Sequence, residues 1–238
     1  MQTRGMIRAG AICLIILAIA NIGLDLINAL TFSLPMALQG DLEVVLPQTL
    51  GQNLLLHDLL VYNSLLPLLL IPGAVGTCYF FSEQGRPVAL TALIFAAFGV
   101  FAWMISQMFW PSVNWYIAQA LMTDNTLAAQ LPPGRLAFAL VGGLNSFVLV
   151  YFGLYIKILA LSLWMFLISL LGLRERNLPE WFCYFGVILA IIAWVLLVLR
   201  VIITHPYLLS HGLNFFPIIN LWIFLLGCYF LLSKKDRV

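Results

Sequence analysis

Four charged residues stand inside otherwise apolar stretches of this chain, and they are the residues best placed to do chemistry. Two are acidic, Asp25 and Asp58, and two are basic, Lys157 and Arg200. A charge at the centre of a lipid bilayer costs about 2.5–3.5 kcal/mol on the insertion scale, so such charges usually pair or line a cavity. The balanced set predicts either buried ion pairs that fix helix register or an outward-open pocket. Such a pocket would take a polar headgroup, a small zwitterion or an ion.

Amide side chains share a helical face with Asp25. Asn21, Asp25 and Asn28 are spaced four and three residues apart, and residues at these spacings lie on one side of a helix. Small and apolar residues continue this face toward the N-terminus: Ala11, Leu14 and Ala18. We therefore expect the face to contact other helices rather than lipid. Gln107 and Asn220 are expected to join the same polar layer.

Small residues accompany both basic residues of the apolar stretches. Lys157 shares a helical stripe with Gly142, Ser146 and Gly153, and Arg200 shares one with Gly186, Ala190 and Ala193. Small side chains let a neighbouring helix approach closely. Lys157 is the deeper of the two charges, whereas Arg200 lies close enough to a span end for its side chain to reach the headgroups.

Three histidines, His57, His205 and His211, are expected at the outer surface. Histidine and carboxylate clusters bind zinc or copper, which makes these residues candidate metal ligands. Their spacing fits no metal-binding motif, so we favour polar anchoring at the membrane interface and expect no metal. Because the chain also lacks nucleophile-elbow, zinc-protease and nucleotide-loop motifs, we expect neither a cofactor nor a familiar catalytic centre.

The composition excludes most classes of protein. The chain has 238 residues, of which 63% are hydrophobic and only 8% charged, with a formal net charge of +2. A soluble domain is about 25% charged, so this chain is neither soluble nor disordered. A net charge of +2 that is spread over termini and short loops makes no basic face, which excludes nucleic acid as a partner. What remains is an all-α, polytopic membrane protein.

Apolar runs predict six transmembrane helices in a single domain, 1–238. A span needs about 20 apolar residues to cross a core of about 30 Å. Only the run 136–173 is ambiguous: we favour one long helix with a projecting N-terminal part, and a break near 142–146 with a re-entrant segment is the alternative. The predicted spans are 6–32, 54–81, 87–110, 145–173, 181–204 and 213–232.

Charge asymmetry predicts the orientation of the bundle. Positive residues favour the cytoplasmic side of a membrane. Eight of the arginines and lysines fall on one side of the predicted spans, against Arg135 alone on the other. We therefore expect a multi-pass inner-membrane protein with both termini in the cytoplasm. The sequence around Ala18–Ala20 is similar to a signal-peptide cleavage site, but the apolar run continues beyond it, as in a retained anchor.

The outer loop 111–135 contains one further predicted element. Trp115, Ala118, Leu121 and Met122 recur at helical spacing, which indicates a short amphipathic helix in the interface plane between the third and fourth spans. We interpret this helix as an interfacial plug with aromatic anchors. A lid over an outward-facing cavity is the alternative.

The C-terminal half resembles a known family. Phe152-Gly153 opens a long span, a short basic turn with Arg174, Arg176 and Pro179 follows, and Phe185-Gly186 stands in the next span. In these features the chain resembles the bacterial six-span membrane family called domain of unknown function 4386. The resemblance implies a six-span fold and no particular activity, because that family is uncharacterised.

These observations leave three functional hypotheses. We favour a non-catalytic protein: an accessory or assembly subunit that contacts membrane lipid and other membrane subunits, or a small-ligand binder with an outward-facing polar layer. The first alternative is a small transporter or channel that uses Asp25, Asp58, Lys157 and Arg200. The second is an enzyme that acts on a lipid or quinone, with His57 or Asp58 as the base.

Overall fold

The computed structural model describes residues 2–31, 63–109, 144, 146–202 and 216–233, and every regular element among them is a helix. The predicted all-α class is therefore confirmed for this part of the chain. The α-helices are α1 (Gln2–Thr31), α4 (Leu70–Phe80), α5 (Arg86–Phe109), α9 (Lys157–Glu175), α10 (Glu180–Ile202) and α12 (Phe216–Leu232). A 3-10 segment, η2 (Leu66–Leu69), precedes α4, and a π-helix, η4 (Ser146–Ile156), precedes α9. The predicted interfacial helix in 111–135 lies outside the described residues.

Five helical stretches are long and apolar enough to cross a membrane, and each overlaps a predicted span. They are Arg4–Leu24, Asn63–Phe80, Arg86–Phe109, Phe152–Glu175 and Glu180–Leu199. The apolar part of α12, Ile218–Leu232, is shorter. At 1.5 Å per residue it is about 22 Å long, against a core of about 30 Å. The described residues therefore support a polytopic membrane protein, and the sixth crossing stays a prediction.

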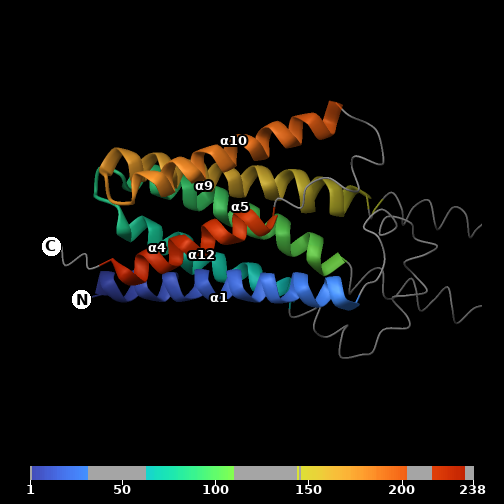
Figure 1. The fold of residues 1–238 in the computed structure, drawn as a ribbon, viewed down its shortest axis with the longest axis horizontal. Coiled ribbons are helices and arrows are strands. Elements are labelled where there is room, and N and C mark those ends of the chain that lie inside the picture. Colours follow the sequence, from blue (N-terminus) through green and yellow to red (C-terminus); the bar gives the residue numbers. More distant parts are fainter. Residues whose placement is uncertain (1, 32–62, 110–143, 145, 203–215, 234–238) are drawn as a thin grey trace, which may run out of the picture.

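The helices form two groups (Figure 1). In the first group α1 lies against both α4 and α12, and in the second group α9 lies against α5, α10 and η4. Contacts between α4 and α5 join the two groups. The start of α1, the end of α12 and both short turns, α4–α5 and α9–α10, lie at the same end of the bundle (Figure 1).

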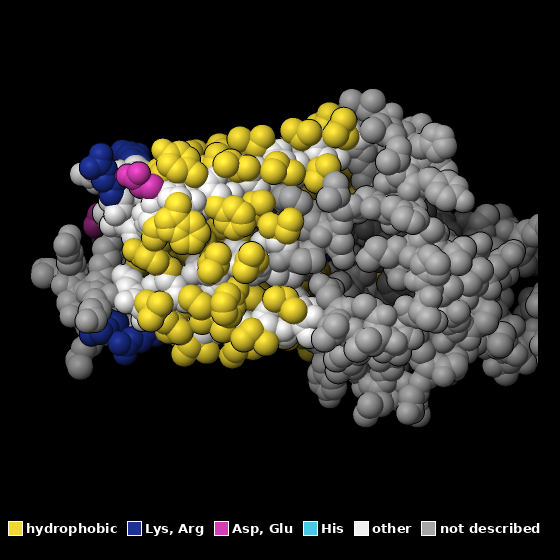
Figure 2. All heavy atoms as spheres, viewed as in Figure 1, with side chains coloured by type: hydrophobic (Ala, Val, Ile, Leu, Met, Phe, Trp, Pro, Cys, Tyr) yellow, Lys and Arg dark blue, Asp and Glu magenta, His cyan; other side chains and the backbone are white. Residues whose placement is uncertain are grey.

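The outer surface of the bundle shows how it is solvated. Hydrophobic side chains form a broad band over the helices, and charged side chains gather at one end of that band (Figure 2). Ile94, Phe98 and Val198 are among the large apolar residues that are more than half exposed, at 65%, 61% and 57%. Such a band matches a hydrocarbon surround, in which exposed apolar side chains carry no penalty. We call this end of the bundle, which carries the α4–α5 and α9–α10 turns, the charged end.

Glycines let the helices of the first group touch backbone to backbone. A β-carbon added to Gly10 of α1 would stand 2.6 Å from the carbonyl oxygen of Pro72 in α4. One added to Gly227 of α12 would stand 2.9 Å from the carbonyl oxygen of Ala11 in α1. Because membrane helices gain little from apolar burial against each other, such close packing is a main source of their association.

Two stretches of the described helices depart from α geometry, one in the second predicted span and one in the fourth. Pro67 lies near the start of the 3-10 segment η2, where the second span is not wound as an α-helix. Pro72 stands in the first turn of α4, where the missing N–H costs little and the helix continues. In the fourth span the helix is continuous from Ser146 to Glu175, with its first part wound as the π-helix η4. The positions 142 and 143 of the suggested break lie outside the described residues.

Glu175 fastens the two turns of the charged end to each other. Its carboxylate accepts hydrogen bonds from the Ser82 backbone N–H at 3.0 Å and the Ser82 hydroxyl at 2.6 Å. It also accepts one from the Asn177 amide at 2.6 Å. The next residue, Arg176, ends α9 in the left-handed region with φ of 54°. The Tyr229 hydroxyl of α12 donates to the Asn177 carbonyl at 2.8 Å, so three parts of the bundle meet here.

Candidate functional site

The predicted amide face of α1 points into the bundle. Asn21 is 5% exposed, and the side chains that precede it on the face, Ala11, Leu14 and Ala18, are fully buried. The Asn21 amide donates to the side-chain oxygen of Asn220 in α12 at 3.3 Å. The side-chain amide nitrogen of Asn220, Nδ2, has no hydrogen-bond partner in the described part of the chain. Asn21 and Asn220 therefore contact each other inside the bundle, and the wider polar layer stays a prediction.

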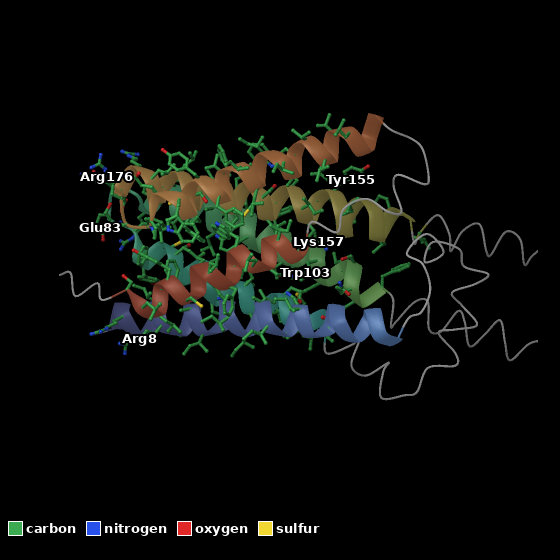
Figure 3. The ribbon with its side chains drawn as sticks, viewed as in Figure 1. Arg8, Glu83, Trp103, Tyr155, Lys157 and Arg176 are labelled. Carbon is green, nitrogen blue, oxygen red and sulfur yellow. The ribbon has the colours of Figure 1, made fainter. Side chains whose placement is uncertain are left out.

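Lys157 lies against an aromatic ring at the start of α9. Its Nζ atom stands 5.5 Å from the centroid of the Trp103 ring of α5 (Figure 3). Trp103 is 2% exposed, so the ring is held among other side chains while the lysine is half-buried. A cation over an indole face is attracted by the ring quadrupole, and the attraction grows when water is excluded.

Glycine and serine bring the two helices together beside this pair. A β-carbon on Gly153 of η4 would stand 2.7 Å from the Ser106 β-carbon of α5. The Ser106 hydroxyl is turned back to its own helix, where it donates to the Trp103 carbonyl at 2.8 Å. The stripe predicted for Gly153 and Lys157 therefore faces a neighbouring helix, as expected.

Lys157 is far from the other charged side chains that the structure describes. Those residues stand at the start of α1 and in or beside the α4–α5 and α9–α10 turns: Arg4, Arg8, Glu83, Arg86, Arg174, Glu175, Arg176 and Glu180. Figure 3 shows Arg8, Glu83 and Arg176 at this end. Because α9 has 19 residues, Lys157 lies about 27 Å along its axis from Glu175. This separation is close to the thickness of a hydrocarbon core, about 30 Å.

Several predicted site residues have no described side chain. Asp25 and Asn28 belong to α1 and Arg200 belongs to α10, so only their helical backbones are placed. Asp58 and the three candidate metal ligands lie outside the described residues: His57, His205 and His211. The proposed pairing of the four intramembrane charges stays a prediction. Among the residues that are described, no three His, Cys, Asp or Glu side chains group as a metal site.

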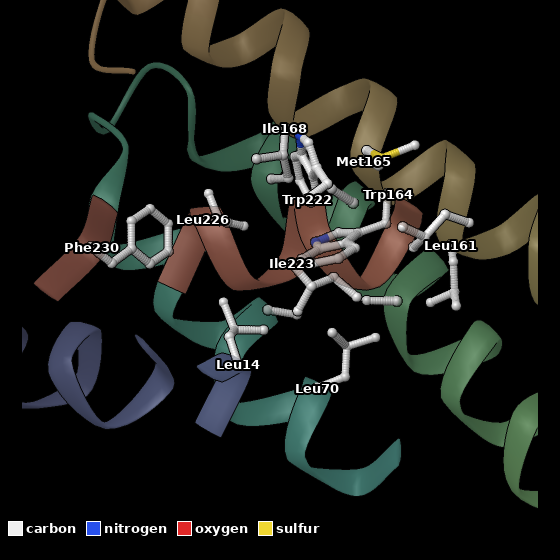
Figure 4. Packing of buried hydrophobic residues seen from close by; sticks show 14 of the residues in the cluster. Leu14, Leu70, Leu161, Trp164, Met165, Ile168, Trp222, Ile223, Leu226 and Phe230 are labelled. Atoms are coloured by element: carbon white, nitrogen blue, oxygen red, sulfur yellow. The ribbon is translucent and has the colours of Figure 1, made fainter. Parts of the chain in front are cut away.

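The sequence interpretation missed the ring beneath Lys157 and a set of buried indoles. Trp103, which lies inside the predicted third span, was assigned no role. Trp164 and Trp222 lie edge to face in the core, with ring centroids 5.4 Å apart (Figure 4). Their indole N–H groups have no hydrogen-bond partner in the described residues. A useful signal was available, because Trp222 lies mid-helix in α12, only two residues from the buried Asn220.

Comparison with known protein families, with curated proteins and with solved structures finds no match to this chain.

Proposed function

We propose that this chain is a six-span inner-membrane protein with both termini in the cytoplasm. Five apolar helices of spanning length and the sixth apolar helix α12 support the span count. The start of α1 and the end of α12 lie at the charged end, which is consistent with an even number of crossings (Figure 1). Arginines of this end, among them Arg8, Arg86 and Arg174, support its cytoplasmic placement.

Within that topology the protein is a non-catalytic ligand binder or accessory subunit, and Lys157 is its ligand-binding cation. The observation that carries this proposal is the Lys157 ammonium over the buried Trp103 ring, at the edge opposite the charged end. A cation supported by an aromatic ring suits an anionic group, such as the phosphate of a lipid headgroup or the carboxylate of a zwitterion. Asn21 and Asn220 provide amide groups in the same polar layer.

The first experiment extracts the protein in native lipid and identifies everything that co-purifies by mass spectrometry. A retained anionic lipid or small anion supports ligand binding, and a stoichiometric membrane protein supports the accessory role. Lys157→Met should then lose at least ten-fold in occupancy of the anion, whereas Lys157→Arg should retain most of it. Arg174→Met, at the exposed charged end, is the matched control. Equal retention by Lys157→Met and the control removes Lys157 from the site.

A transporter or channel is the second candidate, and the observation that favours it is the π-helix directly before Lys157. Such windings are frequent at functional sites and can change register without unfolding the span. This candidate predicts substrate-dependent flux in proteoliposomes that Asp25→Asn or Lys157→Met abolishes. Undiminished flux in both variants would exclude a role for these two residues in transport.

A further inference from the structure

Two serines on one face of α9 meet tryptophans of neighbouring helices, and they meet them differently. Ser162 and Ser169 are seven residues apart, which is two helical turns, and both are fully buried. At Ser162 the polar groups are all paired. The Trp194 indole of α10 donates to its hydroxyl oxygen at 2.8 Å, and that hydroxyl donates to the Leu159 carbonyl at 2.9 Å.

At Ser169 the corresponding groups converge without pairing. Neither the Ser169 hydroxyl nor the Trp222 indole N–H of α12 has a hydrogen-bond partner in the described part of the chain. Both point at the same bare stretch of α10. A β-carbon added to Gly186 would overlap the Ser169 oxygen and would stand 2.6 Å from Trp222 Nε1. Ser169 of α9, Trp222 of α12 and Gly186 of α10 therefore meet at one place.

The surroundings of this place are apolar and closed. Ser169 and Trp222 are each 0% exposed. The Phe182 ring of α10 stacks on the Trp222 indole at 5.3 Å between centroids, and Trp164 meets it edge-on. Ile168 and Ile223 lie beside the indoles in the same core (Figure 4). An unpaired N–H in such a setting lowers stability, and hydrocarbon offers it no acceptor.

The chemistry of the two groups defines what can satisfy both. An indole N–H only donates, and a hydroxyl both donates and accepts. The shared ligand must therefore accept a hydrogen bond from Trp222 and exchange one with Ser169. It must also be small, because no part of either side chain reaches the surface. Buried waters occupy such positions and typically make two to four hydrogen bonds.

We propose that Ser169, Trp222 and Gly186 form a binding site for one long-lived water molecule, which links α12 to the α9–α10 pair. The water accepts from Trp222 Nε1 and bonds to the Ser169 hydroxyl, since both polar atoms lie against α10 at Gly186. Trp222 of α12 also meets Trp164 of α9 and Phe182 of α10 through ring contacts, so the water adds a polar link to an aromatic one. The proposal is independent of the role of Lys157.

The test is indole NMR on the full-length protein in lipid nanodiscs, with ¹⁵N-labelled tryptophan. Trp222→Phe and Trp194→Phe assign the two indole signals. We expect a cross-peak between the Trp222 N–H and a slowly exchanging water, and none for Trp194, whose N–H is bonded to Ser162. Ser169→Ala should weaken the water cross-peak at least three-fold, because one of its two anchors is lost. Ser162→Ala is the matched control and should leave the Trp222 signal unchanged.

Two other results would overturn the proposal. If Ser169→Ala shifts the Trp222 signal but no water cross-peak is present in the parent protein, the two side chains bond directly to each other. A cross-peak from the Trp222 N–H to lipid or to another bound molecule assigns the site to that ligand instead. Ser169→Ala removes only one oxygen from the core, so the comparison does not depend on a variant that disturbs packing.

Discussion

The two helix groups of the bundle use glycine against different neighbours. In the first group Gly10 of α1 faces the backbone carbonyl oxygen of Pro72 in α4. In the second group the nearest neighbours of Gly99 in α5 are the outer side-chain atoms of Leu161 in α9. A side chain can change rotamer, but a carbonyl moves only with its helix. The α1–α4 contact at Gly10 should therefore be rigid in its spacing, and the α5–α9 contact at Gly99 should accept small changes.

The strongest test of this difference is Gly10→Ala. The added methyl group would meet the Pro72 carbonyl oxygen, so α1 and α4 must separate. We expect a loss of about 2–3 kcal/mol in the free energy of unfolding, as for overpacking of a core. Reversible unfolding in mixed detergent micelles measures it. Gly5→Ala on the same helix is the control, since a β-carbon there has no neighbour within 4 Å. Equal stability of the two variants would contradict the rigid contact.

The second prediction concerns the link between the groups at the charged end. Glu175→Ala removes the acceptor of three hydrogen bonds, two of which join the α4–α5 turn at Ser82 to the end of α9. We expect a loss of about 1.5–2 kcal/mol, because the bonds involve a charged group that is partly exposed. Faster amide exchange in both turns should accompany it.

Glu83→Ala provides the control for Glu175→Ala. It breaks the ion pair between Glu83 and Arg86, whose charged atoms are 2.8 Å apart. The Glu83 side chain is 80% exposed and the Arg86 side chain is 41% exposed. Exposed ion pairs contribute about 0–1 kcal/mol, so this variant should remain close to the parent protein. A loss as large as that of Glu175→Ala would mean that charge, rather than the joining of the turns, matters at this end.

The smallest effect is expected for Gly99→Ala in the second group. The new methyl group would stand 2.7 Å from Leu161 Cδ2, which a rotamer change can relieve. Alanine is also favoured over glycine in a helix by about 1 kcal/mol, which offsets the crowding. The net change in unfolding free energy should be below about 1 kcal/mol. A loss that matches Gly10→Ala would end the distinction between the two groups.

The sequence predicts the parts of this structure that depend on short-range pattern. Apolar length locates the spans, and the spacing of Asn21 with Ala18 and Leu14 predicts which face of α1 is buried. The stripe of Lys157 with Ser146 and Gly153 was predicted from α-helical spacing. The structure winds the preceding segment as a π-helix, in which each residue turns the chain by a smaller angle. Trp103 belongs to α5, so the spacing of residues around Lys157 could not identify it as the ring that meets the lysine.

The remaining contacts depend on how separate helices are placed. The Asn21 partner, the Glu175 contacts and the Ser169–Trp222–Gly186 group each join helices or turns that are distant along the chain. No local spacing in one helix encodes the side chain that a second helix will present. Residue types still give a hint, because buried serine, asparagine and tryptophan need hydrogen-bond partners in a membrane.

The bond between Asn21 and Asn220 has a consequence for how the chain is made. Its two residues are 199 positions apart, and α12 is the last of the described helices to leave the ribosome. During synthesis the buried face of α1 must wait for its partner while all the other described helices enter the membrane. A nascent chain without α12 exposes an amide that hydrocarbon cannot satisfy, which is a feature that chaperones and membrane proteases can detect. The first and the last of the described helices thus have to meet before this amide pair is satisfied.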